Sequence, residues 1–403
     1  LNRNIEVNIP DETVNNTETA STEKTETTDI ENKPNETTVE DKPQDTLQDT
    51  SSTETESNLV VELPKVAEID GETYPTITQA IQSVSGTATI KLLDNIELTD
   101  ELVIQSNQNI TLDLNGKTIT STAINTINNQ GTLTITGTGV IKNETENGTT
   151  IYNTGTINLN SGVITTSANG GKAINNSSGT VNVTGGKVVT EGLGAIAIYN
   201  INNGKANVKG GIVETRGFGS KAIYNDAKLE VNNAKVNVAN DDSMAIYNGS
   251  KATECIIKDA EIVIEEKNIE NYELIKDTNE FKAELEQMKP SYGIYNDSKE
   301  EVQINTAIIK VERLKGIGIC NNSNGTITLG IENDTVNEAS PIVYAIADYS
   351  KGIVNSEKGI INYYDGKTLT LSSVKDMITN VLRNYRINED VGEKVINTTL
   401  VLI

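Results

Sequence analysis

Histidine and tryptophan are absent from the 403 residues of this sequence. Histidine is the most frequent general base near neutral pH and a common zinc ligand. Tryptophan supplies the largest aromatic surface for binding a ligand by stacking. The sequence therefore contains no catalytic motif that requires histidine, and the composition disfavours an enzyme.

Apolar side chains are scarce, at 35% of the residues, and aromatic side chains make up only 4%. A chain of this composition is not expected to form one large globular core. No run of about 18 apolar residues occurs, so we predict no membrane insertion. The two cysteines, Cys255 and Cys320, have no metal-binding spacing around them and are predicted to be free thiols. We expect no metal and no cofactor.

Basic residues are outnumbered, with 33 Lys and Arg against 57 Asp and Glu, which gives a formal net charge of -24. Phosphate backbones are bound by clustered basic side chains, so nucleic acid is not expected as a partner. An anionic membrane surface would repel the chain for the same reason.

The first 60 residues differ in character from the rest. Residues 1–60 are rich in Thr, Glu, Asp and Asn and show no apolar periodicity, which predicts a disordered acidic linker. The chain starts at Leu1 and ends with the apolar residues 399–403. We expect both ends to be cuts in a longer polypeptide whose signal peptide and wall anchor lie outside this sequence.

A short motif, most often Ala-Ile-Tyr-Asn, recurs from Ile127 to Asp348. The final residues of its nine copies are separated by 24, 23, 24, 25, 23, 48, 25 and 27 positions. Each unit of about 24 residues contains three short apolar segments separated by polar or glycine-rich turns. This pattern predicts an all-β fold, a right-handed three-faced parallel β-helix with one unit per turn.

The repeat suggests limits for the parts of the fold. Residues 66–120 are predicted to form an N-terminal cap and the first turns, with a short helix after Thr76. Residues 121–365 are predicted to form the regular turns, and residues 366–403 a last turn or cap with a helix at 372–385. The interval of 48 indicates an insertion at 265–290, where the spacing of Phe281, Leu285 and Met288 predicts a small amphipathic helix.

Three early stretches, residues 68–81, 90–95 and 110–119, resemble the opening of the pectin-lyase-like β-helix domains found in surface and adhesin-like proteins of Firmicutes. The Ile-Tyr-Asn repeats and the Tyr-Tyr-Asp-Gly segment at 363–366 are similar to that group as well. The resemblance covers residues 66–403. It implies a β-helix on the surface of a Gram-positive bacterium and says little about activity.

Alternation along a strand predicts which side chains enter the interior. In residues 195–200 it places Ile196, Ile198 and Asn200 inside, and Ala195, Ala197 and Tyr199 outside. The asparagines that end the repeats should then stack as a structural ladder at an interior corner. This ladder comprises Asn153, Asn176, Asn200, Asn225, Asn248, Asn296 and Asn321.

The same alternation predicts an outward stripe of tyrosines, interrupted by Asn175 and Cys320. The stripe comprises Tyr152, Tyr199, Tyr224, Tyr247 and Tyr295. Two interpretations remain open. The rings could stack as a ladder that stabilises neighbouring strands, or they could bind glycans through their faces and hydroxyls.

The sequence contains no catalytic residues that we can assign. Asp241 and Asp242 form an isolated acidic pair in a turn of the repeats. This pair is predicted to be solvated rather than catalytic. We expect a monomeric, extracellular, adhesin-like rod that binds a glycan or protein of a host or bacterial surface, or that spaces other domains. The alternative is a polysaccharide-active β-helix enzyme, a lyase or a hydrolase.

Overall fold

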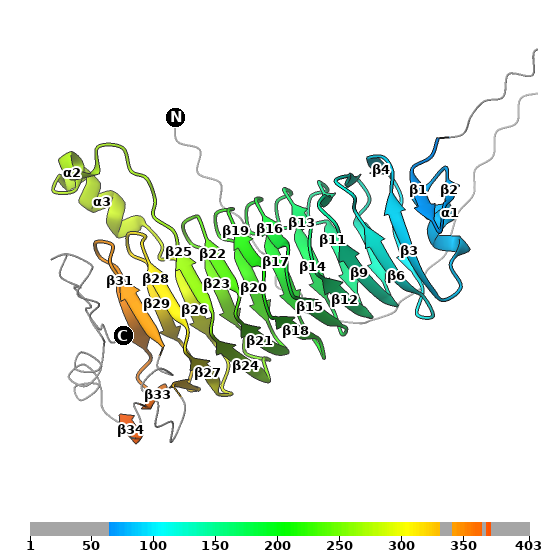
Figure 1. The fold of residues 1–403 in the computed structure, drawn as a ribbon. Coiled ribbons are helices and arrows are strands. Elements are labelled where there is room, and N and C mark those ends of the chain that lie inside the picture. The colour runs from blue at the N-terminus through cyan, green and yellow to red at the C-terminus, as the bar shows by residue number, and fades with distance from the viewer. Residues whose placement is uncertain (1–63, 331–340, 365–367, 372–403) are drawn as a thin grey trace, which may run out of the picture. The chain divides into compact units, whose positions relative to one another are not determined.

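A computed structural model describes residues 64–330, 341–364 and 368–371 of the chain. These residues form a three-faced parallel β-helix of about ten turns, so the predicted fold class is confirmed (Figure 1). The predicted linker at 1–60 and the predicted helix at 372–385 lie outside the described residues, as does most of the predicted C-terminal part at 366–403.

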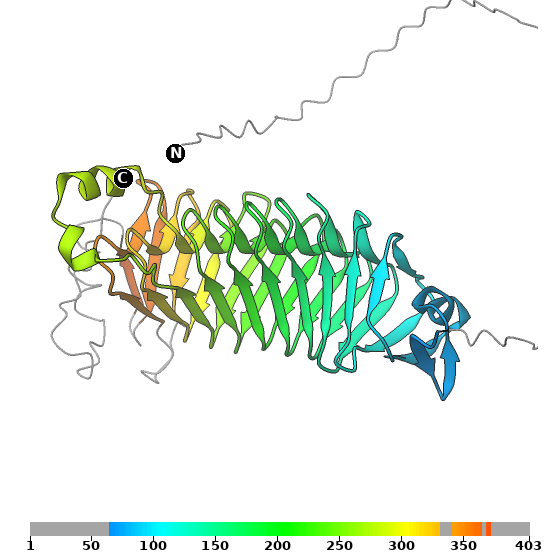
Figure 2. The same cartoon turned by 90° about the horizontal axis from the view of Figure 1, so that it is seen from above.

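Each complete turn contributes one strand to each of three sheets, which we call A, B and C. Within the turns, each strand pairs in parallel with the equivalent strand one turn away, as β14 (Lys172–Asn176) does with β17 (Ile196–Asn200) through Ile174 and Ile198. The short strands at the two ends of sheet A pair antiparallel instead. Successive turns look alike from above as well (Figure 2).

Sheet A comprises β1 Ala67–Ile69, β2 Glu72–Tyr74, β3 Thr87–Leu92, β6 Asn109–Asp113, β9 Thr132–Thr136, β12 Thr156–Leu159, β15 Thr180–Val183, β18 Lys205–Val208, β21 Lys228–Asn232, β24 Glu254–Lys258, β27 Val302–Asn305, β30 Thr326–Leu329, β33 Ile360–Tyr364 and β34 Thr368–Leu371. Sheet B comprises β4 Ile96–Leu98, β7 Thr118–Ser121, β10 Val140–Asn143, β13 Val163–Thr166, β16 Lys187–Thr190, β19 Ile212–Thr215, β22 Lys235–Val238, β25 Glu261–Ile264, β28 Ile308–Val311 and β31 Ile342–Ala345. Sheet C comprises β5 Leu102–Ile104, β8 Asn125–Asn129, β11 Thr149–Asn153, β14 Lys172–Asn176, β17 Ile196–Asn200, β20 Lys221–Asn225, β23 Met244–Asn248, β26 Tyr292–Asn296, β29 Ile317–Asn321 and β32 Lys351–Asn355.

The interior of the β-helix is filled by aliphatic side chains from all three sheets. In one turn Val181 of sheet A, Val188 of sheet B and Ile198 of sheet C are fully buried. Branched residues suit this position because they pack well on a pleated surface and lose little rotamer freedom there. Burial of these side chains in a continuous column is the main stabilising contribution to the fold.

The alternation predicted for sheet C is wrong at the start of each strand. Ala195 and Ala197 are fully buried, whereas Ile196 is only half-buried. Ala197 and Ile198 are thus consecutive buried residues, which a flat strand of period two does not allow. The strand bends at this point, where it leaves the corner with sheet B.

Small side chains fill the corner position that Ala197 occupies. At Gly293 even an added methyl group would lie 3.1 Å from Cγ2 of Ile309 and 2.5 Å from the backbone oxygen of Gly318. The equivalent buried residues are Thr126, Thr150, Ala173, Ala197, Ala222, Ala245, Gly293, Gly318 and Gly352. This column of small residues sets how closely sheets B and C approach.

Replacing Ala222 with leucine should lower the free energy of unfolding by about 1–3 kcal/mol, because the corner has no space for three more carbon atoms. The neighbouring change Ile223→Leu keeps the interior volume nearly constant and should cost less than about 1.5 kcal/mol. Urea denaturation followed by circular dichroism measures both. A smaller loss for Ala222→Leu than for Ile223→Leu would contradict the tight corner.

The N-terminal end of the rod is covered as the sequence predicted. Helix α1 (Ile77–Ser83) starts after Thr76, whose hydroxyl oxygen accepts a hydrogen bond from the backbone N–H of Gln79 at 3.1 Å. Gln108 donates hydrogen bonds of 2.8 Å from Nε2 to the last carbonyls of the helix, those of Ile81 and Val84. The antiparallel hairpin β1–β2 pairs with β3 and covers the first sheet edge.

The insertion predicted at 265–290 lies between β25 and β26. It contains two helices, α2 (Tyr272–Ile275) and α3 (Asn279–Gln287), of which only the second was predicted. Phe281 and Leu285 of α3 are buried, as the periodicity indicated, whereas Met288 ends the helix. The insertion and the N-terminal cap lie at opposite ends of the described rod (Figures 1 and 2).

Candidate functional site

The asparagines that end the sheet C strands form one continuous ladder of side-chain hydrogen bonds. In each step Nδ2 of one asparagine donates to Oδ1 of the next, over 2.7 Å between Asn176 and Asn200 and over 3.0 Å between Asn296 and Asn321. The side chains are almost fully buried. The ladder comprises Asn129, Asn153, Asn176, Asn200, Asn225, Asn248, Asn296, Asn321 and Asn355.

The ladder corrects the alignment of the last repeat. Asp348, which the sequence places in the asparagine column, lies in the turn between β31 and β32. Asn355 at the end of β32 occupies the position instead and accepts a hydrogen bond of 2.9 Å from Asn321. The sequence interval here is 34 residues rather than 27, which hid the true repeat.

Four of the five predicted tyrosines form a contiguous stripe on the outer face of sheet C. The ring centroids are 4.9 Å apart between Tyr199 and Tyr224, 4.8 Å between Tyr224 and Tyr247, and 5.9 Å between Tyr247 and Tyr295. Tyr152 is separated from the others by Asn175, which lies between it and Tyr199 in the register. The sequence did not predict that Tyr292 joins the stripe edge-on to Tyr295, at 4.8 Å.

The stripe is half-buried, and two of its hydroxyls have carboxylate partners. Tyr224 donates to Asp226 over 3.1 Å, and Tyr247 donates to Asp297 over 2.8 Å. Burial, together with these acceptor carboxylates, raises the pKa of both phenols. Burial raises the pKa of Tyr292 to about 12. The tyrosines therefore stay neutral over the physiological pH range.

Neighbouring rings in the stripe contact one another, tilted in two pairs and stacked in the third. Spacings of 4.8–5.9 Å with interplanar angles of 58°, 38° and 18° leave little room for a sugar ring between them. Lysine side chains cover part of the stripe, since the ammonium groups of Lys172 and Lys221 lie 5.6 and 5.7 Å from the centroids of Tyr199 and Tyr247. This geometry favours a ladder that stabilises sheet C over a flat stacking platform.

The two cysteines lie in different surroundings. Cys255 is in the interior column opposite Leu229, and Cys320 is opposite Tyr295 at the end of the stripe. Both are free, and burial raises the pKa of each thiol to about 12. Thiols with so high a pKa are poor nucleophiles.

Asp241, the first member of the acidic pair in the β22–β23 turn, is largely buried, which corrects the prediction that it is solvated. The side chain of Asp241 is 14% exposed and forms ion pairs of 2.8 Å with Arg313 and 2.6 Å with Lys267. Burial alone would raise the pKa of Asp241, but hydrogen bonds from Lys267 and Arg313 hold it below its ordinary value. This cluster could not be predicted from the sequence because its members are far apart along the chain.

This cluster anchors the insertion to the rod. Lys267 and Lys289, near its two ends, bind Asp241 and Asp242, the latter over 3.2 Å. Arg313, whose side chain is only 3% exposed, also donates to the backbone oxygen of Ala239 over 2.7 Å. Two ion pairs, one near each end of the insertion, therefore hold it to the β22–β23 turn, and Arg313 holds Asp241 in place.

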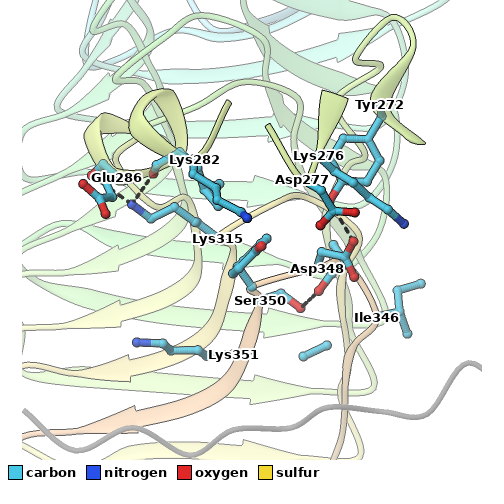
Figure 3. A pocket seen from close by; sticks show the side chains of 14 residues that line it. Tyr272, Lys276, Asp277, Lys282, Glu286, Lys315, Ile346, Asp348, Ser350 and Lys351 are labelled. Atoms are coloured by element: carbon cyan, nitrogen blue, oxygen red, sulfur yellow. Dashed lines mark hydrogen bonds between the residues drawn. The ribbon is translucent and has the colours of Figure 1, made fainter. Parts of the chain in front are cut away.

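The anchored insertion and the last described turns enclose a hollow of about 900 Å³ (Figure 3). Ligand sites in proteins commonly measure roughly 300–1,000 Å³. In Figure 3, Lys282, Lys315 and Lys351 lie on the left of the hollow, and Tyr272 and Asp348 lie on the right. The sequence did not predict this hollow because its lining comes from three separate parts of the chain, residues 272–286, Lys315 and residues 345–351.

Both walls are braced by hydrogen bonds. The hydroxyl of Tyr272 donates to Asp348 over 2.7 Å, which links α2 to the β31–β32 turn. Nζ of Lys315 donates to the backbone oxygens of Leu285 and Met288 over 2.8 and 2.6 Å, at the C-terminal end of α3. A cation there is favourable because the last carbonyls of a helix lack internal partners.

Together the fold and these features define the chain as a parallel β-solenoid with one anchored helical insertion. No protein-family model, curated protein or solved structure matches it. Among the described residues there is no helix long and apolar enough to cross a membrane. The same part of the chain contains no group of three or more His, Cys, Asp or Glu side chains arranged to hold a metal ion.

Proposed function

We propose that this chain is an extracellular rod of a bacterial surface, adhesin-like in that it presents a binding site to ligands of a host or neighbouring cell. The observation that carries the proposal is the combination of a regular rod with a helical insertion, which ion pairs at both of its ends hold beside a hollow. Solenoids commonly bind through such insertions, while the repeats supply length and stiffness.

The surface location rests on the sequence. The Thr- and Glu-rich segment at 1–60 has the composition of a solvated spacer, and its like charges favour extension. The resemblance of residues 66–403 to surface β-helix domains supports the same location. An antibody raised against the rod should label intact cells of the source bacterium, and labelling of permeabilised cells alone would contradict the proposal.

The binding role predicts selective retention of the full chain on an array of glycans and host-matrix proteins. A variant with Tyr224→Phe and Tyr247→Phe keeps the rings and removes two hydroxyls of the stripe. Since those rings stack on one another, we expect this variant to bind the same ligands with affinity changed less than about threefold. Loss of binding in this variant would show that the tyrosine stripe is the binding site.

The alternative function, a polysaccharide lyase or hydrolase, is tested on the same ligands. Incubation of the full chain with each retained polysaccharide, followed by assays for new reducing ends and for unsaturated sugars, should give no product. Catalytic turnover would replace the rod proposal, and retention of no ligand at all would leave only a spacer.

A further inference from the structure

One position in the turns between sheets B and C requires a left-handed backbone. It lies two residues before seven of the ten described sheet C strands, and φ there is between 54° and 68°. Glycine, asparagine and aspartate adopt this conformation most readily. The residues at this position are Asn147, Gly170, Gly194, Gly219, Asp242, Lys315 and Tyr349.

The last two members of this series break the rule. Lys315, with φ of 54°, and Tyr349, with φ of 59°, are side chains that disfavour the left-handed region. Both line the hollow beside the insertion. Backbone strain that persists in one place indicates that the side chain there is needed.

Contacts within the rod explain Lys315 but not Tyr349. Lys315 binds the C-terminal carbonyls of α3, as described above. Tyr349 is 54% exposed, and within the described part of the chain no hydrogen bond or ring contact holds it. Ile346 in the same turn is also exposed, at 45%. Tyr349 and Ile346 thus expose an aromatic ring and an aliphatic side chain on the wall of the hollow, and neither exposed side chain has an evident role in stabilising the fold.

The charges around this ring are unevenly paired. Lys276 forms an ion pair with Glu273 over 2.5 Å, but Lys282 and Lys351 form no ion pair within the described residues. Tyr272 occupies one carboxylate oxygen of Asp348, while the carboxylate of Asp277 remains an available acceptor on the same wall. Lys282 and Lys351 thus line the hollow without an acidic partner among the described residues, so an anionic group that entered the hollow could pair with them.

We propose that this hollow binds an anionic saccharide, a sugar ring that carries a carboxylate or a sulfate group. The ring packs against Tyr349 and Ile346, its hydroxyls donate to Asp277 and Asp348, and its anionic group binds Lys282 and Lys351. The inference rests on the proposed function only in assuming that the rod has a ligand.

The test is titration calorimetry of the full chain with 3′-sialyllactose, with lactose 3′-sulfate and with neutral lactose. At low salt the two acidic sugars should bind at least tenfold more tightly than lactose. Preference for one of them identifies the group as carboxylate or sulfate. Equal affinity for lactose, or no saturable binding of either acidic sugar, would overturn the proposal.

Substitutions separate binding from folding. Tyr349→Gly should weaken binding at least tenfold while the unfolding midpoint stays the same or rises, because glycine relieves the left-handed strain. Asn147→Gly makes the same change at the same turn position far from the hollow and should leave binding unchanged. Lys351→Gln should weaken binding at least tenfold, whereas Lys187→Gln, which removes an exposed lysine of sheet B, should not.

The outcomes also distinguish this site from the proposed function. If the full chain is retained on the glycan and matrix array, and Tyr349→Gly and Lys351→Gln are retained equally well, the rod binds elsewhere and the saccharide site is wrong. If the full chain is retained on no ligand of the array but binds the acidic sugars, the site stands and the adhesin-like role fails.

Discussion

Replacing Asn200 with aspartate should lower the free energy of unfolding at pH 7 by about 3–5 kcal/mol, the cost of an uncompensated charge in a buried position. Nδ2 of Asn200 donates to Asn225 and to the backbone oxygen of Lys228, both over 2.8 Å. Aspartate would place a second acceptor against each of these oxygens. Urea denaturation followed by circular dichroism measures the loss.

Two comparisons make this prediction specific to the ladder. Asn160 is exposed and uses only its oxygen, which accepts from Thr184 over 2.9 Å, so Asn160→Asp should change stability by less than about 0.5 kcal/mol. At acid pH the difference in the free energy of unfolding between Asn200→Asp and the unchanged chain should also become smaller, because a protonated carboxyl can donate a hydrogen bond again. Equal losses for the two variants would show that the ladder contributes little.

Replacing Arg313 with methionine should be the second most damaging change, at about 3 kcal/mol, because it removes the more buried of the two cations that pair with Asp241 and leaves the carboxylate with Lys267 alone. The loss should be concentrated in the insertion. Hydrogen exchange should speed up in α3 and in the β22–β23 turn, and much less in sheets A and C near the N-terminal cap. Chemical denaturation gives the global value.

The double variant Asp241→Asn with Arg313→Met tests the cause. With the carboxylate removed as well, no partly buried acidic group is left short of a cation, and we expect more than half of the lost stability to return. The single change Asp242→Asn affects only the exposed pair with Lys289 and should cost less than about 1 kcal/mol. Additive losses in the double variant would show that Arg313 and Asp241 do not depend on each other.

The fold was predictable because each turn of a solenoid repeats the same residue pattern in the sequence. Ile198 and Asn200 recur with every turn, so their interior positions follow from spacing alone, and the Thr76 cap of α1 follows from local rules. The last repeat was misaligned because the interval to Asn355 is longer than the others. The bend at Ala197 escaped prediction because strict alternation assumes a flat strand.

The candidate site was much less predictable. The contacts of Asp241 with Lys267 and Arg313 join residues 26 and 72 positions apart and leave no periodic signal. The left-handed position of Tyr349 could have been noticed, since the aligned turns carry Gly-Gly, Gly-Ala, Gly-Ser and Asp-Ser where this turn has Tyr-Ser. The unusual residue at this turn position can be noticed only when the final turns are aligned correctly. The alignment of Asp348 with the asparagine column prevented this.

The corner that carries the insertion accommodates extra residues without a change in the register between neighbouring turns. Asn248 reaches Asn296 across 48 residues with a hydrogen bond of 2.9 Å, as short as those between turns of ordinary length. The backbone N–H of Tyr292 likewise donates to the backbone oxygen of Ser243 over 2.8 Å, so the two turns pair normally despite the inserted residues. Natural variants could therefore exchange the segment at 265–290, and with it their specificity, on an unchanged scaffold, and a protein engineer could graft a foreign loop there.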